Sequence, residues 1–132
     1  MNVPLLVAGS LGVLGAAIHG VAGEVLVVRR LSPESLPATP FGGPRMTQVM
    51  IRAAWHMTTI AFLTFGIALV PTGSVLHGDT ERGIGVVAAA ASTGFAAIAL
   101  GGAFARAPRS LFRHPAPALL TAVAVLAWAG IA

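Results

Sequence analysis

Apolar residues fill four long runs of the chain, and short polar segments separate these runs. The runs cover residues 3–28, 46–70, 83–105 and 115–132. Three of them reach the ~20 residues that an α-helix needs to cross the ~30 Å hydrocarbon core of a bilayer. The last run is shorter, at about 16 to 18 residues or ~24–27 Å of helix. The pattern predicts an all-α fold, a four-helix transmembrane bundle that forms a single domain in contact with lipid.

Composition supports this membrane interpretation. Hydrophobic residues make up 56% of the 132 residues and charged residues only 9%, whereas a soluble domain usually carries about 25% charged residues. The chain has no Cys and no Lys, which excludes disulfides, cysteine-based zinc sites and thiol nucleophiles. The net charge of +4 comes from arginines that mostly lie between the apolar runs. This distribution favours anchoring at a membrane surface and argues against nucleic acid as a partner.

The arginines are unevenly distributed over the three loops, residues 29–45, 71–83 and 106–117. The first and third loops hold three arginines each and the second holds one: Arg29, Arg30 and Arg45, then Arg82, then Arg106, Arg109 and Arg113. Loops rich in arginine stay in the cytoplasm. We therefore expect a multi-pass membrane protein with both termini outside. The first run lacks the basic start of a signal peptide and arginines follow it, so we expect a retained helix.

Two histidines lie inside the first two runs at matching depths. His19 precedes Arg29 by ten residues, and His56 follows Arg45 by eleven residues. Because the two helices run antiparallel, both imidazoles are expected ~15 Å from the cytoplasmic boundary, close to the bilayer midplane. The sequence therefore predicts that His19 and His56 lie at one level and form a pair.

A carboxylate and a guanidinium share a second depth, nearer the cytoplasmic side. Glu24 is five residues before Arg29, and Arg52 is seven residues after Arg45. An unpaired charge inside a membrane is costly, so we expect Glu24 to be the counter-ion of Arg52. Glu24 lies ~140° around the helix from His19, which places it at the border of the face that carries His19.

The spacing of other polar and small residues predicts which helix faces meet. Polar side chains on the second helix recur at steps of four, four and three residues, on one face: Gln48, Arg52, His56 and Thr59. Small residues surround His19 on the first helix and allow close helix packing: Gly12, Gly15, Ala16 and Gly23. Trp55 is compatible with two roles: an aromatic anchor at the membrane interface, or, because its depth places it next to His56, a ring that packs over a ligand of the site.

Three kinds of chemistry are compatible with this polar site. The first is binding of a small polar or anionic ligand, or a proton relay, in which Arg52 contacts the anion and the histidines contact ligand or protons. The second is electron transfer by haem b, with His19 and His56 as axial ligands. The third is a metal site, with copper as the candidate ion, in which Met50 and Met57 join the two histidines.

Two further interpretations need no chemistry. The two polar pairs would fix the register of the helices, since hydrogen bonds between membrane helices contribute ~0.6–2 kcal/mol. Alternatively, the chain is a non-catalytic accessory subunit whose glycine-rich faces pack against a larger membrane complex or a second copy of itself. The sequence contains no nucleophile–base pair and no hydrolase or metalloprotease motif, so an enzyme is the least supported class.

Two segments carry a resemblance to known sequences: AAIHGVAGEVLVVRRL (16–31) and RAAWHMTTI (52–60). They resemble an uncharacterised group of small bacterial membrane proteins with four helices, a His and a Gly-Glu near the end of helix one, and Arg-x-x-Trp-His in helix two. The matching positions are His19, Gly23, Glu24, Arg52, Trp55 and His56. The resemblance covers roughly the first half of the chain. It implies a bacterial inner (cytoplasmic) membrane location and a site at these residues, but it adds no reaction.

Overall fold

The computed structural model describes residues 1–40, 42–106 and 114–132. The first helical segment, Val3–Arg30, comprises α1 (Val3–Ala17), a π-helical turn (Ile18–Ala22), α2 (Gly23–Leu26) and a 3₁₀ turn (Val28–Arg30). After a short 3₁₀ turn in the first loop, three more helices follow: α3 (Pro44–Ser74), α4 (Gly78–Arg106) and α5 (Ala116–Ala129). The expectation of an all-α protein with four helices is confirmed.

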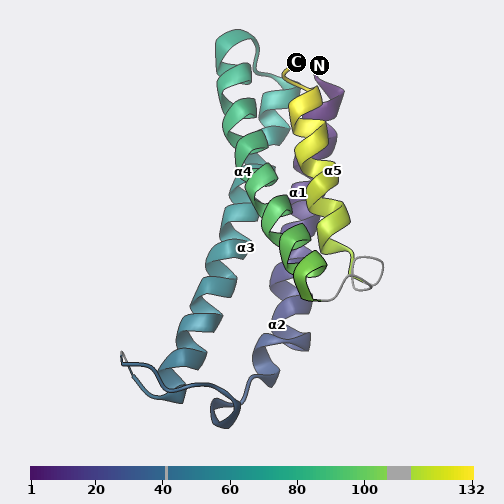
Figure 1. The fold of residues 1–132 in the computed structure, drawn as a ribbon. Coiled ribbons are helices and arrows are strands. Elements are labelled where there is room, and N and C mark those ends of the chain that lie inside the picture. The colour runs from purple at the N-terminus through teal and green to yellow at the C-terminus, as the bar shows by residue number, and fades with distance from the viewer. Residues whose placement is uncertain (41, 107–113) are drawn as a thin grey trace.

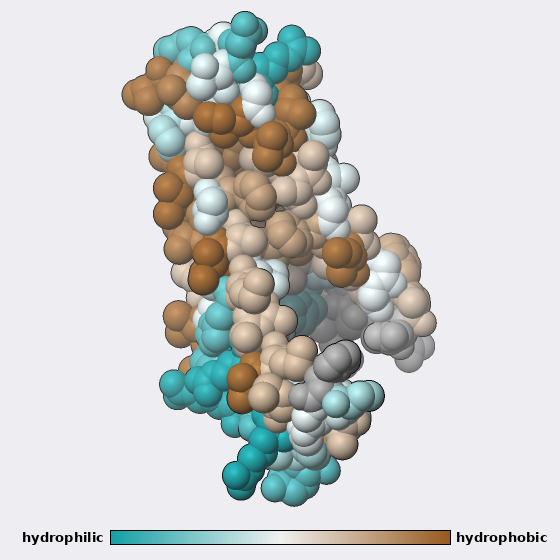
Figure 2. Space-filling model, turned by 90° about the vertical axis from the view of Figure 1, so that its left-hand side faces the viewer, coloured by the Kyte–Doolittle hydropathy of each residue, from teal (hydrophilic) through white to brown (hydrophobic). Residues whose placement is uncertain are grey.

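Three of the helices are long and apolar enough to cross a membrane: Val3–Arg30, Pro44–Ser74 and Gly78–Ala105. With 31 residues, α3 is ~46 Å long and exceeds the ~30 Å hydrocarbon core. The fourth helix, α5, is apolar but has only 14 residues. Apolar residues cover the middle of one face of the molecule, and hydrophilic residues gather at its two ends (Figure 2). This surface is that expected of a multi-pass membrane protein.

The helices form a bundle in which α1 packs against α3 and α5, and α4 packs against α5 and α3. Both termini lie at the same end (Figure 1). Asn2 connects this end: its side chain accepts a hydrogen bond from the Leu5 N–H and caps α1. The Asn2 amide also donates to the Gly130 carbonyl at 2.6 Å and to Glu81 Oε1 at 2.7 Å. One side chain therefore ties the start of the chain to its end and to α4.

The turn between α3 and α4 is shorter than the polar pattern indicates. The sequence predicts a helix stop at Pro71, but α3 continues to Ser74, because a proline removes only one helical hydrogen bond and membrane helices tolerate this. The next helix, α4, begins at Gly78, whose φ of +68° allows the chain to reverse. Asp79 and Glu81 lie in its first turn, where carboxylates stabilise the positive end of the helix dipole.

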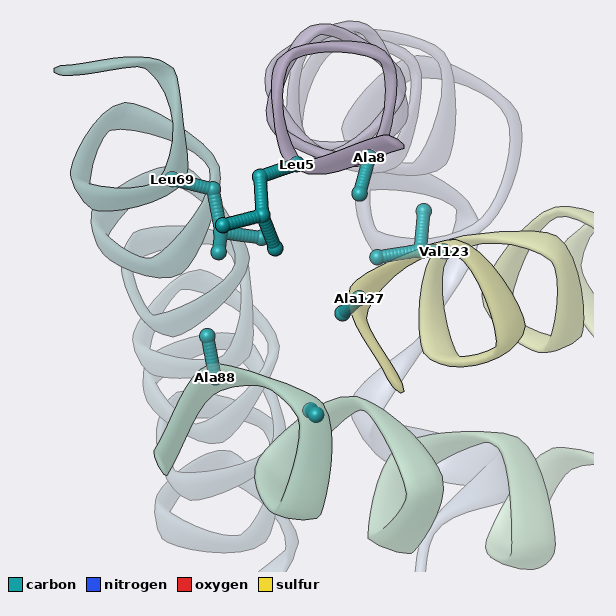
Figure 3. Packing of buried hydrophobic residues seen from close by; sticks show 7 residues of the cluster. Leu5, Ala8, Leu69, Ala88, Val123 and Ala127 are labelled. Carbon is teal, nitrogen blue, oxygen red and sulfur yellow. The ribbon is translucent and has the colours of Figure 1, made fainter. Parts of the chain in front are cut away.

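The packed core lies in the half of the bundle that contains the termini (Figure 3). It consists of buried, mostly small side chains from all four helices: Leu5, Ala8, Leu69, Ala88, Ala89, Val123 and Ala127. Here α1 and α3 approach backbone to backbone. A Cβ atom on Gly66 would lie 2.6 Å from the Val13 nitrogen, and one on Gly9 would lie 2.9 Å from the Gly66 carbonyl oxygen. Glycine is required at this crossing because any side chain would separate the helices.

The short helix α5 covers only part of the first helical segment. A Cβ atom on Gly130 would lie 2.6 Å from Leu5, and one on Gly15 would lie 2.9 Å from Leu119, close to the start of α5. Beyond that level, α2 and the first turns of α3 continue as a two-helix extension (Figure 1). Two arginines that carry part of the orientation prediction, Arg109 and Arg113, lie outside the described residues.

The glycine crossing gives a stability prediction. We expect Gly66→Ala to destabilise the protein by about 1–3 kcal/mol, the usual cost of overpacking, because the new methyl group meets the α1 backbone. Gly83→Ala on α4 is the matched control, since a Cβ there has open space and alanine favours helix more than glycine does. Unfolding in mixed micelles with increasing SDS compares the two. A Gly66→Ala variant as stable as wild type would contradict the close crossing.

Candidate functional site

A nearly buried carboxylate connects the first helical segment with α3. The Glu24 side chain is only 10% exposed, and three basic side chains contact it. Arg52 Nη2 lies 2.5 Å from Glu24 Oε1, Arg29 Nε lies 3.4 Å from the same oxygen, and His56 Nε2 lies 3.1 Å from Oε2. We call these four residues the ion cluster. The Glu24–Arg52 pair expected from depth counting is confirmed, and His56 shares its carboxylate.

The spacing along α3 explains how two of its side chains reach one carboxylate. Arg52 and His56 are four residues apart and therefore lie on the same helix face. One turn earlier, Gln48 donates from Nε2 to the Leu31 carbonyl at 2.6 Å and holds the end of the first segment. The outer parts of the cluster remain accessible, since the side chains of Arg52 and His56 are 55% and 43% exposed. Both oxygens of Glu24 are already bonded within the protein.

The expected His19–His56 pair does not form. His19 Nδ1 instead lies 2.8 Å from Thr59 Oγ1, one turn further along α3, while His56 bonds Glu24. The indole of Trp55 stacks on the His19 ring, with ring centroids 4.3 Å apart and an interplanar angle of 8°. Trp55 Nε1 also donates to the His19 carbonyl at 3.1 Å. His19 is therefore fixed by Thr59 and Trp55.

A π-helical turn at Ile18–Ala22 explains why depth counting failed here. In such a turn the hydrogen bonds run from i to i+5, so each residue advances by a smaller angle around the axis. Glu24, which an ideal α-helix places ~140° from His19, is thereby brought round toward α3. Glu24 therefore bonds His56, and His19 bonds Thr59. The sequence carries no signal for this turn, apart from the small residues within it.

Glycines on the first segment make room for these contacts. A Cβ atom on Gly23 would overlap the indole of Trp55, and one on Gly20 would lie 2.8 Å from Thr59 Cγ2. Gly15 makes room in the same way for Leu119 of α5. The small-residue groove predicted around His19 therefore exists, and it admits an aromatic ring and a helix of the bundle. Trp55 stacks on His19; its expected role over a ligand stays a prediction.

A cavity of about 310 Å³ lies between the four helices next to His19. Its walls are almost entirely apolar, and the side chains of Phe62, Phe65 and Phe95 are among them. Besides Trp55, whose Nε1–H donates to the His19 carbonyl, three side chains bring polar groups to the lining: His19, Ser92 and His114. The volume is at the lower end of the ~300–1,000 Å³ typical of ligand pockets. The cavity is therefore large enough for a small molecule.

The structure thus divides the predicted site into two parts. His19, Trp55, Gly15 and Gly23 line the cavity, whereas Glu24, Arg52 and His56 are not among the described residues that line it. Sequence reasoning missed three contributors. Arg29 had only its five-residue spacing from Glu24 as a signal. Ser92 and the phenylalanines lie in apolar runs, and nothing in one sequence shows that three helices bring them together around His19.

The described residues do not fit the proposed haem or copper sites. Axial ligation by His19 and His56 requires one nitrogen from each ring on opposite sides of a single iron. His56 Nε2 instead bonds Glu24 outside the cavity lining, and His19 Nδ1 bonds Thr59. Met50 and Met57 are exposed on α3. Within the described residues, no three His, Asp or Glu side chains are grouped to hold a metal ion.

The ion cluster is tested by a double-mutant cycle on Glu24 and Arg52. We expect Glu24→Gln and Arg52→Gln to be non-additive, with a coupling energy of about 0.5–1 kcal/mol, because each residue loses its partner in either single variant. Arg30 is the control: it follows Arg29 directly but has no ion pair with Glu24 among the described contacts. The Glu24→Gln and Arg30→Gln effects should add. Additivity in both cycles would contradict a functional Glu24–Arg52 pair.

Comparisons with known proteins identify no family for this chain. No protein-family profile, no curated protein and no solved structure matches it. The resemblance of its first half to small bacterial membrane proteins stays an expectation from the sequence. Any account of function must therefore be built on the two parts of the site themselves: the ion cluster and the cavity beside His19.

Proposed function

We propose that the chain is a polytopic membrane protein that binds a small, largely apolar ligand in the cavity beside His19. The observation that carries this proposal is a cavity of about 310 Å³ with apolar walls and few polar groups, the usual composition of a small-molecule site. Two aromatic contacts hold the His19 ring in place: Trp55 stacks on it, and Phe62 meets it edge-on. In this account Arg52 pairs with Glu24, and the ion cluster fixes the helices around the cavity.

The length of α5 indicates where the two parts lie in a bilayer. With 14 residues, α5 spans only ~21 Å, which leaves ~9 Å of the ~30 Å hydrocarbon core beyond its ends. Its start is near the level of Gly15, because Leu119 packs there, and Glu24 is nine residues further along. We therefore assign the ion cluster to the headgroup region of the cytoplasmic side, with both termini outside. Arginine side chains reach polar surroundings readily at that depth.

This assignment replaces the midplane position expected for the two histidines. Helices longer than the hydrocarbon core extend beyond it, so counting inward from the loop arginines overestimates depth. The cavity then lies in the hydrocarbon region next to the cytoplasmic headgroups. A ligand dissolved in the lipid can enter there, because Ile18, Leu26 and Val27 line the cavity and are also about half exposed on the surface.

Ligand binding has more support than a proton relay. A relay needs a continuous chain of hydrogen-bonding groups across the protein. The described hydrogen bonds form two pairs: Glu24 with His56, and Thr59 with His19. Within the described residues no hydrogen bond joins His56 to either Thr59 or His19, so no direct hydrogen bond links these two pairs. The cavity, in contrast, needs no further element to hold a molecule.

A second candidate function is that of an accessory subunit or homo-oligomer. The observation that favours it is the outer face of α4, where Gly94 and Gly101 are seven residues apart and a Cβ on either would have open space. Ile98 is largely exposed between them. Small residues at this spacing allow another membrane helix to approach closely. Such packing would use a different surface from the cavity and is compatible with ligand binding.

Filling the cavity tests the proposed function. Ala22 lines the cavity, and Ala17 is exposed on the same helical segment, so Ala22→Leu and Ala17→Leu form a matched pair. The probe is photoactivated 3-trifluoromethyl-3-phenyldiazirine, a small uncharged aromatic compound, applied to the protein in lipid nanodiscs. We expect Ala22→Leu to reduce labelling of the peptide that contains His19, while Ala17→Leu leaves it unchanged. Equal labelling in both variants would contradict a ligand cavity at this position.

A further inference from the structure

We infer that the cavity takes an uncharged, lipid-soluble molecule with a flat ring and a hydroxyl group, of the phenol or hydroquinone class, whose O–H donates to His19 Nε2. This inference rests on the proposed function, because it names the chemical class of the ligand for the same cavity. Three features of the cavity carry it: the absence of charge from the described lining, the aromatic walls, and the hydrogen-bonding state of His19 and Ser92.

The lining favours an uncharged ligand. No Asp, Glu or Arg is among the described residues that line the cavity, so a charged ligand would lose its hydration without gaining a counter-ion. The nearest charged group described above, the ion cluster, is already satisfied internally, since Glu24 bonds Arg29, Arg52 and His56. Among the described lining residues, a ligand charge of either sign would therefore meet no permanently charged partner.

The walls favour a flat ring. Phe62 meets His19 edge to face, with ring centroids 5.3 Å apart at an angle of 76°. Phe95 meets Phe62 in the same way at 4.7 Å and 87°, and Phe65 lies 6.4 Å from Phe95. The four rings form a continuous wall of the cavity. Aromatic rings pack best against such a wall through offset or edge-to-face contacts, and a volume of about 310 Å³ suits a single ring with short substituents.

The hydrogen bonds of Thr59 determine which group His19 offers to a ligand. A hydroxyl has one proton to donate, and Thr59 Oγ1 donates it to the Trp55 carbonyl at 3.1 Å. This arrangement makes Thr59 the acceptor from His19 and assigns the proton of the 2.8 Å contact to Nδ1. In a neutral imidazole the other nitrogen, Nε2, is then an acceptor. A ligand group that donates a hydrogen bond, such as a ring hydroxyl, satisfies it.

Ser92 supplies a second polar group to the same cavity. Its neighbour Thr93 donates to the Ala89 carbonyl one turn back at 2.8 Å, a usual arrangement for hydroxyls in helices. Ser92 makes no such bond within the described residues, although it lines the cavity and is only 5% exposed. No described side-chain oxygen is sealed off without a partner, so the Ser92 hydroxyl is reachable from the cavity and can take a hydrogen-bond partner there. An oxygen on the ligand provides that partner, as either donor or acceptor.

The test compares four probes that differ in a single substituent. They are 2,3,5,6-tetramethylphenol, its methyl ether, the parent 1,2,4,5-tetramethylbenzene, and 2,3,5,6-tetramethylbenzoate. The readout is the concentration dependence of the thermal unfolding midpoint in detergent, since a ligand of the folded state stabilises it by mass action. We expect the phenol to bind about three- to tenfold more tightly than the hydrocarbon or the ether, the effect of one net hydrogen bond. The benzoate should bind most weakly.

Two site variants, each with a matched control, locate the effect. His19→Phe keeps a ring to stack on Trp55 but removes the acceptor, so it should abolish the preference for the phenol, while His77→Phe in the α3–α4 turn should not. Ser92→Ala, a mild change within α4, should weaken phenol binding severalfold, and Ser10→Ala on the outside of α1 is its control. In the Ala22→Leu variant the new side chain fills the cavity, so any stabilisation by a probe that remains measures binding elsewhere on the protein.

The outcomes separate the ligand class from the proposed function. If the hydrocarbon, the ether or the benzoate binds as tightly as the phenol, and Ala22→Leu weakens that binding, the cavity binds ligands but the phenol class is wrong. A phenol preference that survives in His19→Phe also overturns the assignment to Nε2. If none of the four probes distinguishes wild type from Ala22→Leu, both the ligand class and the proposed function are overturned.

Discussion

The arrangement of the first two membrane-spanning segments depends on the nearly buried carboxylate of Glu24. A carboxylate removed from water is costly unless it is paired, and here three basic groups contact its two oxygens. Two of them, Arg52 and His56, come from α3, so the charge can be satisfied only when α3 lies in one register against α2. At the other end, Gly66 of α3 crosses the α1 backbone closely, and this contact sets the separation of the two helices.

These two constraints leave space between them. The helices touch backbone to backbone near the termini and are held by charge near the other end, while the large rings of Trp55 and Phe62 occupy the intervening level. The cavity lies beside these rings. Because the ion cluster is satisfied internally, the polarity that remains for a ligand is the imidazole of His19 and the hydroxyl of Ser92.

The sequence predicted the features that follow from regular helix geometry. Long apolar runs indicated the helices, and equal distances from the loop arginines paired Glu24 with Arg52 correctly. The same counting failed for His19, because the π-helical turn changes the angle per residue and Thr59 became its partner. The cavity could not be predicted, because most of its lining residues come from the apolar runs. In such a run a serine such as Ser92 is equally compatible with close helix packing and with a cavity wall.

The division of the polar residues into two independent parts is the central claim, and ¹⁵N NMR of histidine-labelled protein in lipid bilayers tests it most directly. The account predicts that His19 is protonated at Nδ1 and unprotonated at Nε2, because Thr59 accepts from it. It also predicts that Glu24→Gln shifts the signals of His56 and leaves those of His19 unchanged. A proton on Nε2 of His19, or equal shifts of both histidines in Glu24→Gln, would contradict the account.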